Sequence, residues 1–263
     1  MTATTGTFEE LWQFRELFYF LAWRDIKVRY KQTALGVVWA ILQPLLTMII
    51  FSLLFGRIAK LAPEGVPGPV FYFSGLLPWL YFTTTLTLAG NSMVQNTNLV
   101  TKVYFPRIIL PASVAASSLL DFLVGSTLLV GLIAWYKLAI GPAILLWPLL
   151  IFLLVLFTLG VSFILAALNV QFRDVKYAIP FFIQLWMFGT PIIYPVSRIP
   201  EDWRWLLTLN PMTGIVEAFR YAIVPAGVFP ARTLSVSIAS SFLVFAVGFY
   251  WFRRTERVFA DIV

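Results

Sequence analysis

Few residues in this chain could carry out chemistry, and the residue types that are missing exclude most catalytic sites. The 263 residues include no Cys and no His, which excludes disulfides, thiolate nucleophiles, His general bases and most zinc sites. The sequence also lacks a Gly-rich phosphate loop ending in Lys-Ser/Thr, so the chain does not bind ATP by that device. Asp121 is the one acidic residue near the middle of an apolar run. An intramembrane carboxylate is a candidate for function, but Asp121 has no charged neighbour in sequence, which favours helix–helix hydrogen bonding over a proton relay.

The composition identifies the surroundings in which these residues must be positioned. Hydrophobic residues make up 60% of the chain and charged residues 12%, with a mean hydropathy of +0.87. Soluble domains contain about 25% charged residues, so half that density cannot cover a soluble surface. The chain is therefore expected to be an integral membrane protein, and its net charge of +7 indicates cations held at the cytoplasmic face rather than binding to nucleic acid.

Long unbroken apolar runs predict transmembrane helices rather than the alternating strands of a barrel. We expect an all-α polytopic protein with six spans: Gly36–Phe55, Val70–Ala89, Ile108–Tyr136, Ile144–Leu168, Tyr177–Tyr194 and Leu234–Phe252. The fifth span is expected to be interrupted near Gly189-Thr190-Pro191. These form one domain over 1–263, with a cytoplasmic interface helix in 1–35, a transmembrane region in 36–252 and a cytoplasmic tail in 253–263. The charged residues of 1–30 argue against a cleavable signal peptide.

The distribution of Lys and Arg predicts the orientation. One side would carry twelve of the 19 cations: Arg15, Arg24, Lys27, Arg29, Lys31, Lys102, Arg107, Arg173, Lys176, Arg253, Arg254 and Arg257. The other side would carry seven. By the excess of positive charge on cytoplasmic loops, the first side is the cytoplasm, and both termini lie there.

The segment Phe8–Lys31 is too charged to insert into the bilayer. Its polar residues recur every three or four positions, with Phe20 as an apolar exception, and Leu11, Phe14, Phe18 and Ala22 lie on the opposite side. The polar positions are Glu9, Gln13, Glu16, Arg24, Lys27 and Lys31. This spacing predicts an amphipathic helix lying on the cytoplasmic face, which serves as a lipid anchor, as a docking surface for a partner, or as both.

Three further loops are unlike simple turns. The loop Asn91–Pro106 mixes polar and apolar residues and predicts a short helix that inserts into a groove on a partner, and Asn169–Lys176 is a third cytoplasmic feature. Outside, Trp203–Leu209 and Met212–Val224 are too short to cross and predict re-entrant or interfacial helices. There Glu217 and Arg220 are spaced to neutralise each other, and Glu201-Asp202 is expected to cap the helix starting at Trp203.

Several motifs resemble one family in order along essentially the whole chain. The run Arg24-Asp25-Ile26-Lys27-Val28-Arg29-Tyr30-Lys31, continuing through Leu35-Gly36 to Trp39 and Gln43-Pro44, resembles the start of span one in membrane subunits of ABC-type polysaccharide exporters (Wzm/TagG-like), which export O-antigen, teichoic acid and capsule. The other matching motifs are Ser74-Gly75-Leu76-Leu77-Pro78-Trp79, Lys102-Val103-Tyr104-Phe105-Pro106, Arg173-Asp174-Val175, Thr190-Pro191-Ile192-Ile193-Tyr194 and Asn210-Pro211-Met212. Each motif is weak alone, and the ordered set is specific.

The resemblance implies a permease in the cell inner membrane that pairs with a second copy of itself and with two ATP-binding cassette subunits. Those subunits would bind ATP and Mg²⁺, so this chain would be no enzyme and would hold no cofactor or metal. The substrate implied is a polysaccharide on undecaprenyl diphosphate, moved outward through the pore of the homodimer. Membrane lipid completes the expected partners, and nucleic acid is not among them.

The resemblance also implies roles for individual residues. The lipid-linked diphosphate would enter at the Leu35-Gly36 turn, beside cations suited to an anionic head group: Arg24, Lys27, Arg29 and Lys31. Sugar rings would pass aromatic side chains lining the channel, namely Trp39, Phe181, Phe182 and Trp186. Coupling to the ATPase would fall to two cytoplasmic loops: Asn96, Leu99, Lys102, Tyr104, Phe105, Arg173 and Asp174.

Three alternatives compete with this interpretation. An ABC-class drug or small-molecule exporter would share the six spans and the coupling loop, although the Leu-Gly turn and the aromatic density favour a polymer. An ion-coupled secondary transporter would need several membrane carboxylates or internal repeats. A membrane-bound glycosyltransferase or ligase would need catalytic acids on a loop, and Glu201-Asp202 is the only adjacent acidic pair on the outer side.

Overall fold

The computed structural model describes residues 7–31, 37–63, 65–172, 174–224, 228–256 and 259, and these residues form helices joined by turns. The helices are α1 (Thr7–Gln13), α2 (Arg15–Lys31), α3 (Val37–Phe51), a π-helix (Ser52–Ile58), α4 (Gly68–Gln95), α5 (Thr97–Lys102), α6 (Ile109–Trp135), a 3-10 turn (Pro142–Leu146), α7 (Trp147–Gln171), α8 (Val175–Phe188), a second 3-10 turn (Val196–Arg198), α9 (Glu201–Leu209), α10 (Pro211–Ile223) and α11 (Ala231–Thr255). The all-α prediction is confirmed for the described residues.

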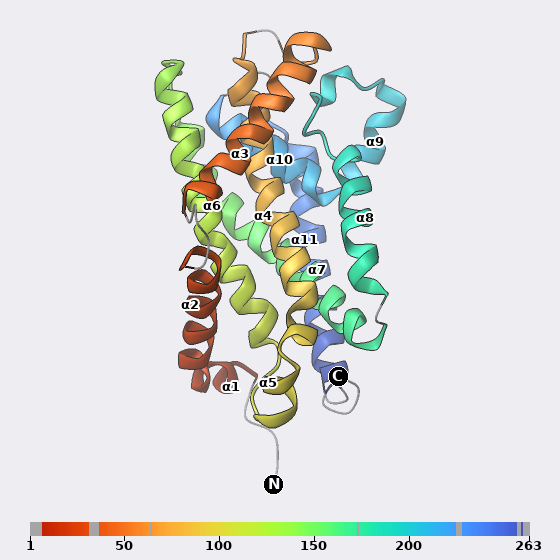
Figure 1. Ribbon diagram of the computed structural model, residues 1–263. Helices are drawn as coiled ribbons and strands as arrows, with labels where there is room; N and C mark the ends of the chain where they lie inside the picture. Colours follow the sequence, from red (N-terminus) through yellow and green to blue (C-terminus); the bar gives the residue numbers. More distant parts are fainter. Residues whose placement is uncertain are drawn as a thin grey trace.

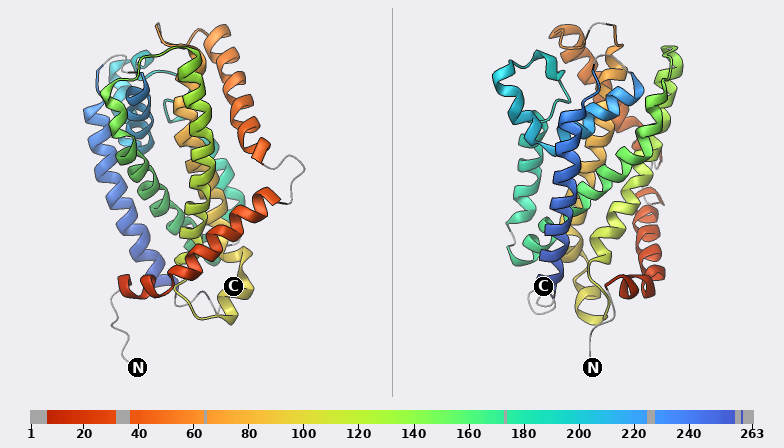
Figure 2. Two further views of the ribbon diagram at one scale, coloured as in Figure 1. Left: turned by 90° about the vertical axis from the view of Figure 1, so that its left-hand side faces the viewer. Right: turned by 180° about the vertical axis from the view of Figure 1, so that it is seen from behind.

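The centre of the molecule is a bundle in which α4 packs between α6 and α7 and α11 runs along α7 (Figures 1 and 2). Its interior is aromatic: the rings of Phe82 and Phe157 stack with centroids 5.6 Å apart, and Phe122 meets Phe219 edge to face at 6.0 Å. Offset and edge-to-face pairs of this kind add to the packing energy of a helix bundle. The bundle therefore has a fixed, close-packed core.

Four helical segments of the described chain are long and apolar enough to cross a membrane: Val38–Ile58, Ile109–Trp135, Pro142–Gln171 and Ala231–Thr255. They correspond to the first, third, fourth and sixth predicted spans. The second prediction falls within α4, which is 28 residues long but less apolar. The reason is burial: most of α4 faces other helices, so its Ser, Thr and Asn side chains avoid lipid.

For the predicted span Tyr177–Tyr194, the interruption near Gly189-Thr190-Pro191 is confirmed, but no helix continues beyond it to Tyr194. Helix α8 has 14 residues and ends at Phe188, where Gly189 begins a run of turns. At about 1.5 Å per residue α8 is roughly 21 Å long, shorter than the hydrocarbon core of a bilayer. The six-span count is therefore not confirmed by helix length and composition.

The N-terminal segment is two helices rather than the single amphipathic helix expected. The chain bends at Phe14, and α2 then rises along α6 instead of lying flat below the bundle (Figures 1 and 2). The predicted polar residues Glu16, Lys27 and Lys31 are exposed. The aromatic residues Tyr19, Phe20 and Trp23 are exposed too, so α2 lacks a simple division between a polar and an apolar face.

The short helices predicted elsewhere are confirmed with small differences. The loop Asn91–Pro106 contains α5, and the outer segment contains α9 and α10. Helix α10 begins where its sequence predicts, because the Asn210 side chain accepts a hydrogen bond from the Met212 amide (3.0 Å) and Pro211 starts the first turn. The predicted capping by Glu201-Asp202 is wrong, because α9 already begins at Glu201 and Pro200 occupies the N-cap position without a side-chain hydrogen bond. The two acidic residues favour the helix N-terminus from within its first turn.

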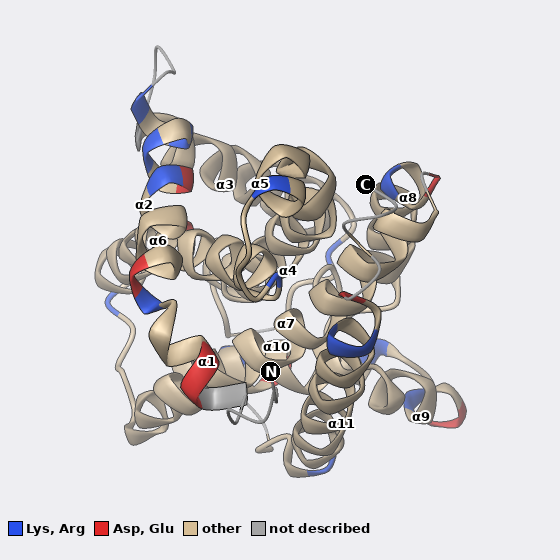
Figure 3. Ribbon diagram, turned by 90° about the horizontal axis from the view of Figure 1, so that it is seen from below, with Lys and Arg blue, Asp and Glu red and all other residues tan. Residues whose placement is uncertain are grey.

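The two ends of the described chain meet at one end of the bundle. Arg253 near the end of α11 forms an ion pair with Glu10 of α1 (2.8 Å), and Arg107 donates to the carbonyl of Glu256. Seen from this end, the ribbon is coloured for basic residues on α2, α5 and α11 (Figure 3). This end thus carries several of the cations that the sequence assigns to the cytoplasm, Lys102, Arg107 and Arg253 among them.

Candidate functional site

Asp121, the carboxylate in the middle of an apolar helix, has partners that its sequence neighbours do not reveal. It lies about halfway along α6, roughly 18 Å from Ile109 at 1.5 Å per residue. Arg29 forms an ion pair with one carboxylate oxygen, and the Tyr30 hydroxyl donates to the other. Both partners belong to the last turn of α2. The prediction of hydrogen bonding between helices is confirmed, with α2 as the partner helix.

A cavity of about 300 Å³ opens beside this cluster. Its polar wall contains Arg29, Tyr30, Gln43 and Asp121. Its apolar wall comes from α3, α4 and α6: Trp39, Pro44, Leu77, Leu80 and Phe122. The side chains of Arg29 and Asp121 remain 25% and 28% exposed, so a bound molecule can reach them. A cavity that is charged at one end and apolar elsewhere suits a ligand with an anionic head and an apolar tail.

The hydroxyl of Tyr30 is held in its protonated form. Burial raises its pKa above the ordinary value, and the hydrogen bond to Asp121 and the charge of Asp121 raise the pKa further. Arg29 opposes this effect and is outweighed. Tyr30 therefore acts as a hydrogen-bond donor to Asp121 across the whole physiological range of pH.

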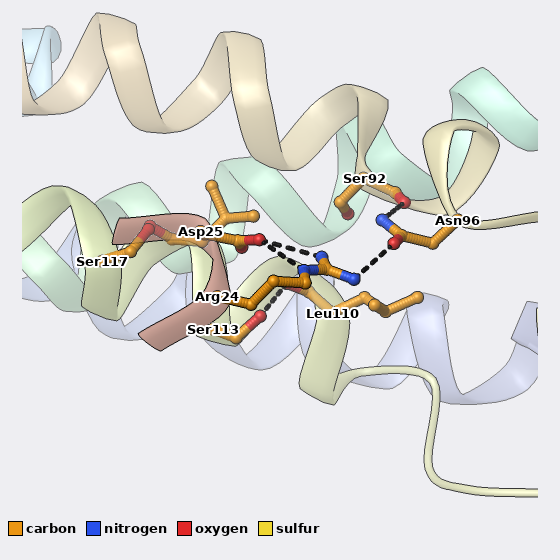
Figure 4. Close-up of polar contacts among 8 residues, drawn as sticks. Arg24, Asp25, Ser92, Asn96, Leu110, Ser113 and Ser117 are labelled. Carbon is orange, nitrogen blue, oxygen red and sulfur yellow. Dashed lines mark hydrogen bonds and ion pairs between the residues drawn. The ribbon is translucent and has the colours of Figure 1, made fainter. Parts of the chain in front are cut away.

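A second cavity, of about 340 Å³, lies further down α2, between α2, α4 and α6. Arg24 donates to Asp25 Oδ1 at 2.8 and 3.0 Å and to Asn96 Oδ1 at 3.0 Å (Figure 4). Asn96 in turn donates from Nδ2 to the Ser92 carbonyl at 2.8 Å. Because Asn96 ends α4 and begins α5, Arg24 ties α2 to the helix predicted to contact the ATPase.

The four cations predicted at the head-group entrance thus fall into two classes. Arg24 and Arg29 are engaged in ion pairs within the chain. Lys27 and Lys31 are exposed, with Lys27 Nζ 5.7 Å from the centre of the Trp23 ring. Leu35 and Gly36 lie outside the described residues. The structure therefore brings Arg29 to a cavity and leaves the head-group role of all six residues a prediction.

The four predicted channel aromatics also differ in their surroundings. Trp39 lines the upper cavity, and Phe181 and Phe182 are exposed on α8. Trp186 is instead packed into the bundle: its ring meets Phe82 edge to face at 5.1 Å, and Nε1 donates to Asn210 Oδ1 at 2.9 Å. It anchors the turn before α10, and the channel role of all four residues stays a prediction.

The predicted coupling residues gather at the same end of the bundle. Asn96 begins α5, Leu99 packs partly buried against a lower core, and Phe105 is buried in that core. Lys102, Tyr104 and Asp174 are exposed, and Asp174 occupies the N-cap position of α8. Arg173 lies outside the described residues. Three of these residues are therefore accessible to a partner, and Phe105 is a packing residue.

Sequence reasoning missed the role of Arg220 at the outer end. Its guanidinium donates to the carbonyls of Phe71 (3.3 Å), Pro191 and Ile192 (2.6 Å) and lies 3.9 Å from the centre of the Phe71 ring. Glu217, its predicted partner, accepts instead from Thr233 at 3.2 Å. No residue spacing in the sequence predicts a guanidinium that donates to backbone carbonyls, because these carbonyls come from α4 and the 191–192 turn.

Comparison with known proteins gives the family. Residues 16–224 match the family described as ABC-2 type transporter. The chain belongs to this family. It is 32% identical over 257 residues to the O-antigen export system permease protein RfbA of Myxococcus xanthus, covering 97% of this chain and 98% of that protein. It is 30% identical over 244 residues to the protein of the same name from Klebsiella pneumoniae, covering 91% and 92%.

A more distant relative is the polysialic acid transport protein KpsM of Escherichia coli, 26% identical over 243 residues, covering 89% of this chain and 91% of that protein. The resemblance to membrane subunits of ABC-type polysaccharide exporters is thereby confirmed. Membership of the ABC-2 type transporter family also disfavours the secondary-transporter and glycosyltransferase alternatives. The chain is a membrane subunit of ABC-2 type, and the region where α2 meets α4 and α6 is its candidate site.

Proposed function

We propose that this chain is the membrane-spanning subunit of an ATP-driven exporter in the cell inner membrane. Its substrate is a polysaccharide such as O-antigen, linked to undecaprenyl diphosphate and moved from the cytoplasm outward. The observation that carries the proposal is end-to-end similarity to polysaccharide export permeases. The cavity beside Arg29 agrees with it, because it combines a cation with an apolar wall suited to an isoprenoid diphosphate.

The channel is proposed to form between two copies of the chain. The apolar side chains of α3 are largely uncovered, with Ile41, Leu46 and Ile50 exposed, as are Phe181 and Phe182 on α8. Without a hydrophobic driving force in lipid, helices associate by packing and by interhelical hydrogen bonds. A second copy packed on α3 and α8 would bring the exposed aromatic residues of both chains to one central path.

Energy is proposed to come from two ATP-binding cassette subunits, which would bind ATP and Mg²⁺ at the lower end of the bundle. That end presents the exposed residues Lys102, Tyr104 and Asp174, and Figure 3 shows basic residues on α2 and α5 in the view from this end. Movement of the ATPase against α5 would then act on α4 directly, since Asn96 joins the two helices. This chain itself would catalyse no reaction.

Reconstitution tests the proposal. The chain and its ATPase, placed in proteoliposomes with undecaprenyl diphosphate-linked glycan on the ATPase side, should transfer the glycan to the other side only when ATP is present. A variant ATPase that binds but does not hydrolyse ATP is the matched control. Transfer by the chain alone, or transfer of a small apolar drug instead of the glycan, would contradict the proposal.

A further inference from the structure

Helix α2 carries two polar connections that no role described so far explains. Near its end, Arg29 and Tyr30 hold Asp121 in the middle of α6. Five residues earlier, about 7.5 Å along the helix, Arg24 holds Asn96 at the junction of α4 and α5. One continuous helix thus links the upper cavity to the helix predicted to contact the ATPase.

We propose that Asp121 is a built-in counter-ion for Arg29, displaced when a lipid diphosphate enters the upper cavity. The exchange breaks the ion pair between α2 and α6, so α2 shifts on α6 and passes the change through Arg24 to Asn96 and α5. This inference rests on the proposed function, since it assigns the regulation of the same site. It makes substrate occupancy the signal that the ATPase receives.

The geometry favours exchange over a permanent structural pair. Arg29 and Asp121 are only partly buried and both line the cavity, so an anion can approach the guanidinium without first opening the bundle. A diphosphate carries more negative charge than a carboxylate and offers oxygens that match the planar fork of Arg. It therefore competes for Arg29 where a neutral lipid does not.

Tyr30 makes the exchange reversible. When Arg29 turns to the diphosphate, Asp121 keeps the hydrogen bond from the Tyr30 hydroxyl, so its carboxylate is not left without a partner. A charge stranded in an apolar helix would be strongly unfavourable. Repulsion between Asp121 and the diphosphate then tilts the end of α2 about the hydrogen bond between Tyr30 and Asp121, and departure of the substrate lets the pair of Arg29 and Asp121 re-form.

The connection to α5 is short and direct. Arg24 donates to Asp25 on its own helix as well as to Asn96, which fixes the direction of its guanidinium (Figure 4). Asn96 is held in turn by the Ser92 carbonyl. Because each of these hydrogen bonds is direct, a shift of α2 must either move the start of α5 or break the bond between Arg24 and Asn96.

The complex of this chain with its ATPase, in lipid nanodiscs, allows a direct test with farnesyl diphosphate as the probe and farnesol as the uncharged control. We expect the wild type to bind farnesyl diphosphate and to hydrolyse ATP faster when it does. Asp121→Asn, which removes the competing charge and keeps the shape, should bind the probe about fivefold more tightly. Its ATP hydrolysis should be raised already without the probe and should not respond to it.

Four further variants separate exchange from a structural role. Arg29→Gln should lose probe binding, and Asn96→Ala should bind the probe as the wild type does while its ATPase no longer responds. Tyr30→Phe leaves the ion pair of Arg29 and Asp121 in place but removes the hydrogen bond that Asp121 would keep once Arg29 has turned to the probe. It should therefore weaken probe binding about threefold. Asp202→Asn, an exposed carboxylate on α9, should match the wild type in every measurement.

The outcomes distinguish this inference from the proposed function. If the wild type binds the probe and Asp121→Asn binds it no more tightly, or if Tyr30→Phe leaves binding unchanged, the exchange is wrong and the exporter role stands. If the wild type binds farnesyl diphosphate no better than farnesol, the anionic lipid substrate fails and the exchange fails with it.

Discussion

The two sides of this bundle are built differently. In Pro142–Gln171, which contains α7, 56% of the most apolar stretch is buried by other helices, against 6% in Val38–Ile58, which contains α3. The α7 side is closed by small residues and aromatic stacking, whereas α3 and α8 present large apolar side chains outward. The fold therefore rests on α4, α7, α10 and α11. The side with the predicted channel residues is left for lipid or a second copy to cover.

The largest expected effect sets a buried ring against an exposed one. Phe157 of α7 is fully buried against Phe82 and Trp186, so Phe157→Ala should lower the free energy of unfolding by about 4 kcal/mol through lost packing. Phe181→Ala on α8 should change it by less than about 0.5 kcal/mol and should weaken pairing of two copies. Unfolding in detergent and cross-linking in membranes measure the two effects. Equal stability losses would remove the distinction between the two sides.

A second test targets the closest helix contact. A Cβ at Gly248 of α11 would lie 2.2 Å from the carbonyl oxygen of Gly160 in α7, so Gly248→Val forces these helices apart. We expect a loss of about 3 kcal/mol in the free energy of unfolding. Gly131→Val in α6 is the matched control, because a Cβ there meets nothing within 4 Å. A stable Gly248→Val protein would show that α7 and α11 can slide.

The sequence predicts individual helices of this bundle better than it predicts the contacts between them. The apolar lengths of α6 and α11 follow from composition, and α9 and α10 follow from their short apolar runs and Asn210-Pro211. The position of α4 at the centre of the bundle could not be predicted from its polar residues, because the sequence of one helix does not show which neighbouring helices bury it. The pairing of Arg29 with Asp121 joins residues 92 positions apart. Sequence spacing identifies neighbours on one helix and cannot choose partners between helices.

Arg220 gives the third test, at the outer end of the core. Arg220→Lys keeps the charge but cannot serve carbonyls from Phe71, Pro191 and Ile192 together. Since unmet buried acceptors are costly, the free energy of unfolding should fall by about 2 kcal/mol. Exposed Arg198→Lys is the control and should cost less than about 0.5 kcal/mol. Thermal unfolding of the purified proteins compares the two, and a Lys that matches Arg would show that charge alone fixes the turn.

The smallest effect on stability is expected at the exposed cations of α2, where function should change instead. Lys27→Gln with Lys31→Gln removes two charges that pack against little, so stability should stay within about 0.5 kcal/mol of the wild type. Each Lys near an anionic head group contributes about 1 kcal/mol, so binding of the lipid-linked substrate should weaken about fivefold for each lysine. Arg232→Gln, in the first turn of α11, is the control for the loss of positive charge. Unchanged export in the double variant would mean that Arg29 and its cavity alone bind the head group. The functional part of the bundle would then be the contact between α2 and α6.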